Sequence, residues 1–246
     1  IGALLSELPM AVEARAAVLR YPDGVCGNSA CEADEAETAA RASTCSYDCG
    51  TPPPRPLRDE LDNAWHVRTV SADRAWGQTR GEGVHVAVLD TGYDSGPGTT
   101  HPDRPENLGF GYNFPSASPD YSAIEGHGTH VAGIIAAPRN GFGTVGVAPG
   151  AIIHPYQIFK RVNGHTAAED ADIIAALESA VRSGYQVVNM SLGGGRDSEL
   201  EHLAIRKANE AGLLVVVASG NAEDFASGSI LTAPSHFPGA YPESFS

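Results

Sequence analysis

From about Leu57 onward, the chain alternates short, continuously apolar runs with segments of helical pattern. The runs predicted as strands are 84–90 (VHVAVLD), 151–159 (AIIHPYQIF), 185–192 (YQVVNMSL) and 213–219 (LLVVVAS). Strands that are apolar along their whole length, separated by amphipathic helices, are typical of a parallel sheet covered on both sides. The sequence therefore predicts an α/β fold, with a parallel β-sheet flanked by helices on both faces.

The segments between these runs carry their own helix signals. Residues 132–137 are predicted to be helical, and a second helix, within 169–184, ends at Gly184. Ser198 and Glu201 form a capping-box pattern that opens a third helix, which Gly212 terminates. The second helix places four apolar side chains on one face: Ile173, Ile174, Leu177 and Val181.

Composition narrows the class of protein. The chain has 246 residues, of which 42% are hydrophobic and 19% charged, as expected for a soluble globular protein with a sizeable core. It contains no apolar stretch of the roughly 18 residues that a membrane span requires. The formal charge of −14 argues against a nucleic-acid partner, because phosphate backbones recruit lysine and arginine.

All four cysteines lie within 24 residues, at Cys26, Cys31, Cys45 and Cys49. Their clustering indicates a local disulfide module, with three possible pairings, in an oxidising and extracytoplasmic setting. Zinc is the alternative, although the spacing is not the usual C-x2-C. The module partly resembles a cysteine-rich repeat of secreted bacterial proteins, and its carboxylates could also hold calcium.

The chain divides into four predicted parts. Residues 1–25 form a helical leader or the remnant of a pro-segment, and residues 26–50 form the cysteine-rich disulfide module. Residues 51–58 include TPPPRP, a stiff linker that excludes helix, and residues 59–246 form the α/β domain. Because the chain opens at Ile1 without a signal segment, we expect it to be processed or trimmed.

Three polar residues stand at or just past the ends of predicted strands: Asp90, Ser191 and Asn221. The carboxyl ends of parallel strands meet at one edge of a sheet, where loops build sites. A carboxylate that ends a buried strand needs a partner, because a lone buried charge is costly. The tripeptide Asp90-Thr91-Gly92 also occurs in aspartic proteases, but those need a second copy and an all-β fold.

The segment EGHGTHVAG contains two histidines, His127 and His130, among small residues. His127 is interpreted as a general base, a structural histidine or a metal ligand, in that order of preference. A base needs a carboxylate to fix its second ring nitrogen, and Asp90 is the candidate. The metal interpretation needs a third ligand, and H-x-x-H lacks the glutamate of zinc-peptidase motifs.

Five segments, in this order, resemble the subtilisin-like serine peptidases (subtilases): VAVLDTG, GHGTHVAG, VGVAPGA, VVNMSLGGG and VVVASGN. The resemblance runs from about Trp65 to the end of the chain. It implies a secreted endopeptidase that hydrolyses peptide bonds of polypeptide substrates by acyl transfer. In that reading Asp90 orients His127, His127 is the general base, and the carboxamide of Asn221 lies in the oxyanion hole.

The same resemblance implies further sites. Residues Ser191, Leu192 and Gly193 would pair with an extended peptide substrate. Residues Ala218, Ser219 and Gly220 would form a wall of the pocket for the residue before the scissile bond, with room for a large apolar side chain. Asp103 and Asn140 match positions that hold structural calcium, and no organic cofactor is implied.

The nucleophile of this family is not found in the sequence. It belongs to a Gly-Thr-Ser-Met-Ala segment well downstream of the asparagine, whereas only 25 residues follow Asn221. We therefore expect a partial peptidase domain with a sheet incomplete at its C-terminus, inactive and poorly stable alone. The nucleophilic serine would reside in a C-terminal fragment or in a part missing by truncation. The alternative function is a non-catalytic extracellular binding protein on a subtilase scaffold.

Overall fold

The computed structural model describes residues 60–94, 101, 103–220 and 236–246. The chain divides into two units, 1–52 and 53–246, and every described residue belongs to the second. The predicted leader, the cysteine module with Cys26, Cys31, Cys45 and Cys49, and the linker all lie outside the described residues. Those assignments stay predictions.

A five-stranded parallel sheet forms the centre of the described unit, as the apolar runs predict. The strand order is β2-β3-β1-β6-β7, so β1 lies in the middle. Each predicted run contains one of these strands, although each strand is shorter than its run. The strands are β1 (His85–Asp90), β2 (Tyr112–Asn113), β3 (Ile152–Gln157), β6 (Val187–Met190) and β7 (Leu214–Val217).

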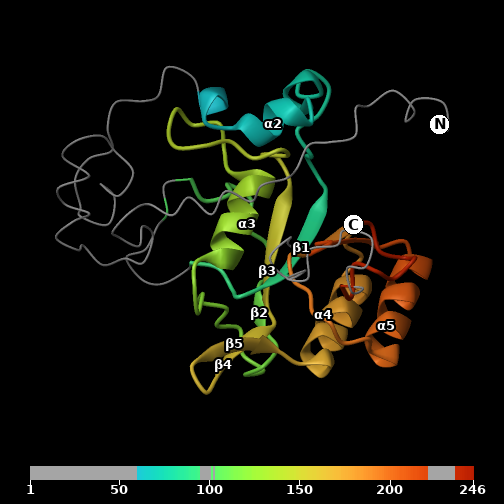
Figure 1. Cartoon of the computed structure of the whole chain (residues 1–246). Coiled ribbons are helices and arrows are strands. Elements are labelled where there is room, and N and C mark those ends of the chain that lie inside the picture. The colour runs from blue at the N-terminus through green and yellow to red at the C-terminus, as the bar shows by residue number, and fades with distance from the viewer. Residues whose placement is uncertain (1–59, 95–100, 102, 221–235) are drawn as a thin grey trace, which may run out of the picture. The chain divides into compact units, whose positions relative to one another are not determined.

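Helices cover both faces of this sheet, which confirms the predicted architecture (Figure 1). Alternate side chains of β1 point to opposite faces, because successive residues of a strand do so. Ala87 and Leu89 pack in one core with helices α4 (Asp170–Arg182) and α5 (Glu199–Glu210). Val86 and Val88 pack in another core with helix α3 (His127–Ala136). The central strand is therefore buried from both sides.

Helices α4 and α5 follow the sequence signals. The side chain of Ser198 accepts the backbone N–H of Glu201, as the capping-box pattern predicts. Gly184 and Gly212 adopt positive φ after the two helices, a conformation that glycine adopts without steric cost. Helix α3 differs from expectation, since it begins at His127 rather than at Ala132.

Two further features lie beside the sheet. The predicted strand 151–159 ends at Gln157, and the chain then forms an antiparallel hairpin of β4 (Phe159–Val162) and β5 (His165–Ala168). Its turn is Asn163-Gly164, with both residues at positive φ, a combination that suits a two-residue hairpin. A short helix, α2 (Trp65–Thr69), lies between 3₁₀ turns at Glu60–Asp62 and Ala72–Arg74.

The last described segment, 236–246, packs against two strand ends. Gly194 and Phe237 exchange two backbone hydrogen bonds of 2.8 Å each. Phe245 forms a parallel bridge beside β7, in which its N–H donates to Val215 and its carbonyl accepts from Val217. This segment therefore holds the loop that follows β6 and pairs beside β7.

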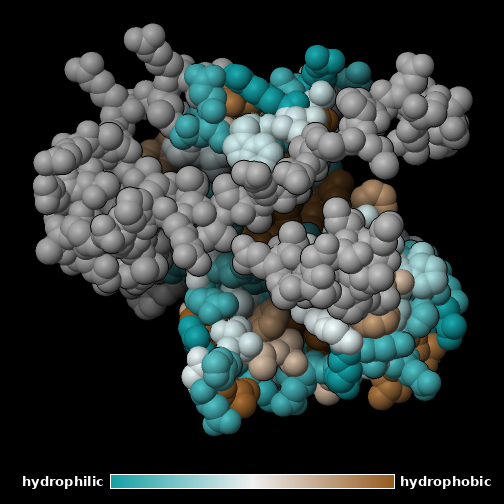
Figure 2. Space-filling view, viewed as in Figure 1, coloured by the Kyte–Doolittle hydropathy of each residue, from teal (hydrophilic) through white to brown (hydrophobic). Residues whose placement is uncertain are grey.

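The space-filling view shows hydrophilic residues over much of the described surface and a group of apolar residues near the centre of this face (Figure 2). Among the described residues, no helix is long and apolar enough to cross a membrane.

Candidate active site

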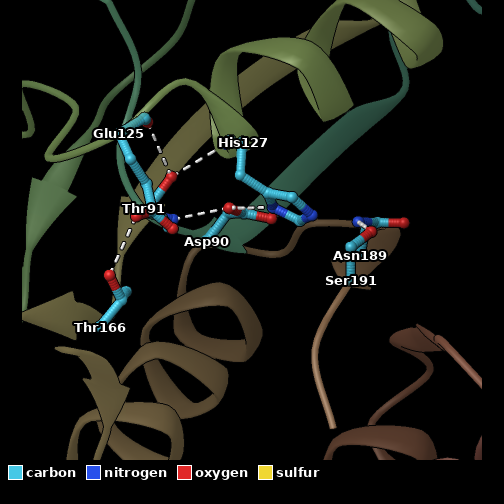
Figure 3. Close-up of polar contacts among 8 residues, drawn as sticks. Asp90, Thr91, Glu125, His127, Thr166, Asn189 and Ser191 are labelled. Atoms are coloured by element: carbon cyan, nitrogen blue, oxygen red, sulfur yellow. Dashed lines mark hydrogen bonds and ion pairs between the residues drawn. The ribbon is translucent and has the colours of Figure 1, made fainter. Parts of the chain in front are cut away.

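Asp90 is the last residue of the central strand β1, and the residue is 1% exposed. Its Oδ1 accepts the backbone N–H of Thr91 at 2.7 Å and lies 2.8 Å from His127 Nδ1. A carboxylate oxygen only accepts, so the imidazole Nδ1 carries the hydrogen of the second contact. The predicted meeting of Asp90 with His127 is present in the structure (Figure 3).

His127 is the first residue of α3, and its side chain is half exposed. The hydrogen bond to Asp90 raises the pKa of His127 above its ordinary value, and the charges of Asp90 and Glu125 act in the same direction. Burial opposes this rise. With Nδ1 held by Asp90, Nε2 is the nitrogen that can accept a proton. The imidazole is thus fixed in one tautomer and made more basic, as a general base requires.

Thr91 links the end of β1, which carries Asp90, to the start of α3, which carries His127. Its hydroxyl donates to the carbonyl of Glu125 at 3.1 Å and accepts the N–H of Gly128 at 3.0 Å (Figure 3). Thr91 is 2% exposed, so these bonds are shielded from water. The residue is part of the Asp-Thr-Gly motif, but its bridging role was not predicted from the sequence.

Gly128 explains why the helix can start so close to β1. A Cβ at this position would overlap the carbonyl oxygen of Gly92 and would lie 3.1 Å from Asp90 Cβ. Only glycine therefore lets α3 approach the end of β1. The close approach places His127 within hydrogen-bonding distance of Asp90.

The metal-ligand interpretation of the histidine pair gains no support. His127 Nδ1 is engaged by Asp90, while His130 is exposed and its pKa is lowered, first by partial burial and then by repulsion from His127. Within the described part of the chain, no group of three or more histidine, cysteine, aspartate or glutamate residues is arranged to hold a metal ion.

The predicted substrate-binding residues lie after the next two strands. Ser191 follows β6, and its hydroxyl accepts the side-chain amide of Asn189 at 2.9 Å. In Figure 3 these two side chains lie on the side to which the His127 imidazole points. Leu192 and Gly193 continue this loop, and Ala218, Ser219 and Gly220 follow β7. Asn221 lies outside the described residues, so its oxyanion role stays a prediction.

The structure brings the two predicted calcium ligands together. Asn140 Nδ2 donates to Asp103 Oδ1 at 3.4 Å, and the N–H of Thr144 donates to Asp103 Oδ2 at 2.9 Å. Asp103 is 6% exposed, and burial raises its pKa to about 6, with a contribution from Glu60. Glu60, 4% exposed, accepts the N–H of Phe142 in the same loop and was not predicted. Two buried carboxylates beside one loop are oxygen ligands of the kind calcium prefers.

A family model described as "Subtilase family" matches residues 81–246. This match covers more than half of the chain and contains Asp90 and His127. The chain belongs to the subtilase family. The resemblance read from the five sequence motifs is confirmed.

Individual relatives agree with the family. An intracellular serine protease of Paenibacillus polymyxa is 40% identical over 184 residues, which is 72% of this chain and 52% of the relative. Subtilisin BL of Lederbergia lenta is 40% identical over 158 residues, 64% of this chain and 55% of the relative. The Minor extracellular protease Epr of Bacillus subtilis is 35% identical over 66% of this chain and 24% of its own length.

Among solved structures, fervidolysin from Fervidobacterium pennivorans, a keratinolytic enzyme related to subtilisin, is similar with a TM-score of 0.56 and 36% identity. The match covers 69% of this chain and 25% of that one. This chain thus spans between about a quarter and about half of the length of these relatives.

Proposed function

We propose that this subtilase chain forms part of a serine endopeptidase that hydrolyses peptide bonds by acyl transfer. The observation that carries the proposal is the 2.8 Å contact between His127 Nδ1 and Asp90 Oδ1 at the end of the central strand. This contact fixes the tautomer and raises the basicity of the imidazole. These are the two properties that a serine nucleophile requires of its base.

In the proposed reaction, His127 Nε2 takes the proton of a serine hydroxyl as that oxygen attacks the scissile carbonyl. The imidazolium then gives the proton to the leaving amine, and Asp90 stabilises the charged ring in between. Asn221 would donate a hydrogen bond to the developing oxyanion. In subtilisin itself, loss of the corresponding donor costs about 10²–10³ in turnover, and a similar cost is expected here.

The remaining assignments follow from the same proposal. Residues 191–193 pair with an extended polypeptide substrate, and residues 218–220 line the pocket for the side chain before the scissile bond. No serine of the printed sequence stands in a Gly-Thr-Ser-Met-Ala context, so the nucleophile is assigned to sequence beyond these 246 residues. It would be supplied later in the same polypeptide or by a second one.

Two further parts of the proposal concern stability and location. Asp103, Asn140 and Glu60 would hold a structural calcium ion. Chelation should then lower the melting temperature of the protein but not that of an Asp103→Asn variant. Secretion fits the four clustered cysteines, as disulfides persist in oxidising compartments. Mass spectrometry before and after reduction measures how many of the four are bonded.

A direct test uses the protein expressed from its complete reading frame. A serine-directed fluorophosphonate should label it, and a His127→Ala variant should lose both the labelling and the hydrolysis of a casein substrate. The matched control is His130→Ala, which removes an exposed histidine of the same helix. Absence of labelling in the unmodified protein would contradict the peptidase proposal and would favour a non-catalytic binding protein on the same scaffold.

A further inference from the structure

Ile124 and Glu125, which come just before helix α3, are bonded to the rest of the molecule from two sides. From the side of β1, the N–H of Ile124 donates to the carbonyl of Thr91 at 3.1 Å, and the Thr91 hydroxyl donates to the Glu125 carbonyl. Gly126 then opens the helix, and glycine has no side chain with which to cap the first turn. The position of His127 therefore depends on bonds from outside the helix.

The second side is the hairpin β4–β5. A guanidinium nitrogen of Arg161 donates to the carbonyl of Ile124 at 3.2 Å and lies 3.4 Å from Glu125 Oε2. The hydroxyl of Thr166 donates to the same carboxylate oxygen at 2.9 Å (Figure 3). Arg161 and Thr166 are cross-strand partners, so the pairing of β4 with β5 places both donors on one face of the hairpin. The carboxylate of Glu125 thus bonds the hairpin to the segment before α3.

These bonds matter more for the place of the imidazole than for the stability of the fold. The side chains of Glu125 and Arg161 are 37% and 52% exposed, and exposed ion pairs contribute little to stability. Three titratable groups act on His127 or are acted on by it: Asp90 from the end of β1, Glu125, and His130 from the same helix. The hydrogen bond to Asp90 is the main cause of the raised pKa of His127, and the charge of Glu125 adds to it.

We propose that Glu125 is a positioning residue, whose carboxylate, bonded to Thr166 and Arg161, holds the hairpin β4–β5 to the start of α3. It thereby fixes the imidazole of His127 at the end of β1. This inference rests on the proposed peptidase function and adds a residue that acts through His127. Displacement of a catalytic group by about 1 Å costs up to about 10² in rate, so bonds that stabilise the fold weakly still govern turnover.

Two variants, made in the protein expressed from its complete reading frame, separate the bonds of the carboxylate from its charge. Glu125→Ala removes both, and should lower kcat about tenfold at about pH 8 with KM changed less than about twofold. Glu125→Gln keeps an oxygen that accepts from Thr166 and Arg161, and should retain most of kcat. In both variants the pKa of His127 should fall, because a negative charge near the imidazole is lost. The acid limb of the kcat/KM profile and the NMR titration of the ring should both move to lower pH.

Thr166 tests whether Glu125 acts through the hairpin. Thr166→Val keeps the shape but removes the donor, and should lower kcat about threefold, as expected for one hydrogen bond. Thr166→Ser should restore kcat. Thr166→Val added to Glu125→Ala should cost no further activity, because residues that share one interaction are not additive.

The matched control is Glu169→Ala, which removes the same charge from an acid that pairs with Lys160 of the same hairpin at 2.6 Å. It should change kcat less than about twofold and leave the titration of His127 in place. Equal losses of kcat in Glu169→Ala and Glu125→Ala would overturn the inference, because the effect would then belong to net charge.

The outcomes separate this inference from the peptidase proposal. Cleavage by the unmodified protein with a kcat that Glu125→Ala leaves unaltered, in a variant whose circular dichroism spectrum shows it folded, would overturn the role of Glu125 alone. If Glu125→Ala does not fold, Thr166→Val and Thr166→Ser decide, and equal kcat in these two would overturn it. Failure of the unmodified protein to cleave any peptide, together with absence of fluorophosphonate labelling, would overturn both.

Discussion

Two buried carboxylates of this subtilase chain, Asp90 and Glu201, have opposite surroundings. Asp90 is 1% exposed at the end of β1, and its Oδ1 contacts both the Thr91 N–H and the His127 imidazole. Glu201 is 6% exposed in the first turn of α5, and its Oε1 is buried without a hydrogen bond among the described residues. Burial, with repulsion from Asp170, raises the pKa of Glu201 to about 7.

The comparison shows how hydrogen-bond donors determine the role of a buried carboxylate. Asp90 accepts hydrogen bonds from the Thr91 N–H and from His127 Nδ1. The second bond orients the imidazole and raises its pKa. Beside Glu201, burial dominates and the carboxyl group binds a proton near neutral pH. The first arrangement bears on catalysis and the second on how the stability of the α4–α5 region depends on pH. The following changes test this contrast, from the largest expected effect to the smallest.

Asp90→Asn should lower kcat by about 10⁴-fold, as replacement of the acid by an amide does in a serine-peptidase triad. The amide leaves the fold nearly unchanged but no longer accepts selectively from Nδ1, so the imidazole takes the wrong tautomer. The measurement is peptide hydrolysis by the protein expressed from its complete reading frame. Asp120→Asn, an exposed acid of a turn, is the control and should change kcat less than twofold.

Glu201→Gln should stabilise the protein at pH 8 by about 3 kcal/mol, because the pKa shift from 4.5 to about 7 corresponds to about 1.4 kcal/mol per unit. The pKa of Glu201 is raised in the folded state, so its contribution to stability is present below pH 4.5 and is lost as pH rises through about 7. The gain should accordingly vanish near pH 4. Denaturant titration at both pH values measures it.

The control for this change is Glu199→Gln, which removes an exposed acid from the same helical turn. If both variants shift the free energy of unfolding equally at pH 8, the effect belongs to net charge, and the contrast between the two carboxylates is wrong.

Thr91→Val should reduce kcat about tenfold and leave KM nearly unchanged, because it removes the bridge between Glu125 and Gly128 without touching substrate. Thr91 is a positioning residue that acts through the Asp90–His127 contact. Thr91→Ser keeps the hydroxyl and should restore most of the activity. Equal losses in the two variants would show that the methyl group, rather than the bridge, matters.

Ser198→Ala should lower the free energy of unfolding by about 1 kcal/mol, the usual cost of a lost helix cap. Ser198 Oγ accepts the N–H of Glu201 at 3.3 Å and donates to Asp170 Oδ2 at 2.6 Å. Thermal unfolding measures the change, and Ser198→Thr should retain most of the stability. Loss of peptidase activity at a temperature where the variant remains folded would contradict a purely structural role.

Much of this molecule could be predicted from local sequence patterns. The apolar strands, the face of α4 and the cap of α5 depend on residues close together in the chain. The early start of α3 was missed, because glycines such as Gly128 disfavour helix, and only contact with Gly92 and Thr91 explains it.

The central claim is that Asp90 makes His127 a base, and an NMR titration of the histidine rings tests it most directly. The account predicts that His127 has a pKa above the ordinary value of about 6.5 and that Asp90→Asn lowers it. His130, three residues away, provides an internal reference with a pKa below the ordinary value in both proteins. A His127 pKa that is no higher than that of His130, or that the Asp90→Asn substitution leaves unchanged, would contradict the account.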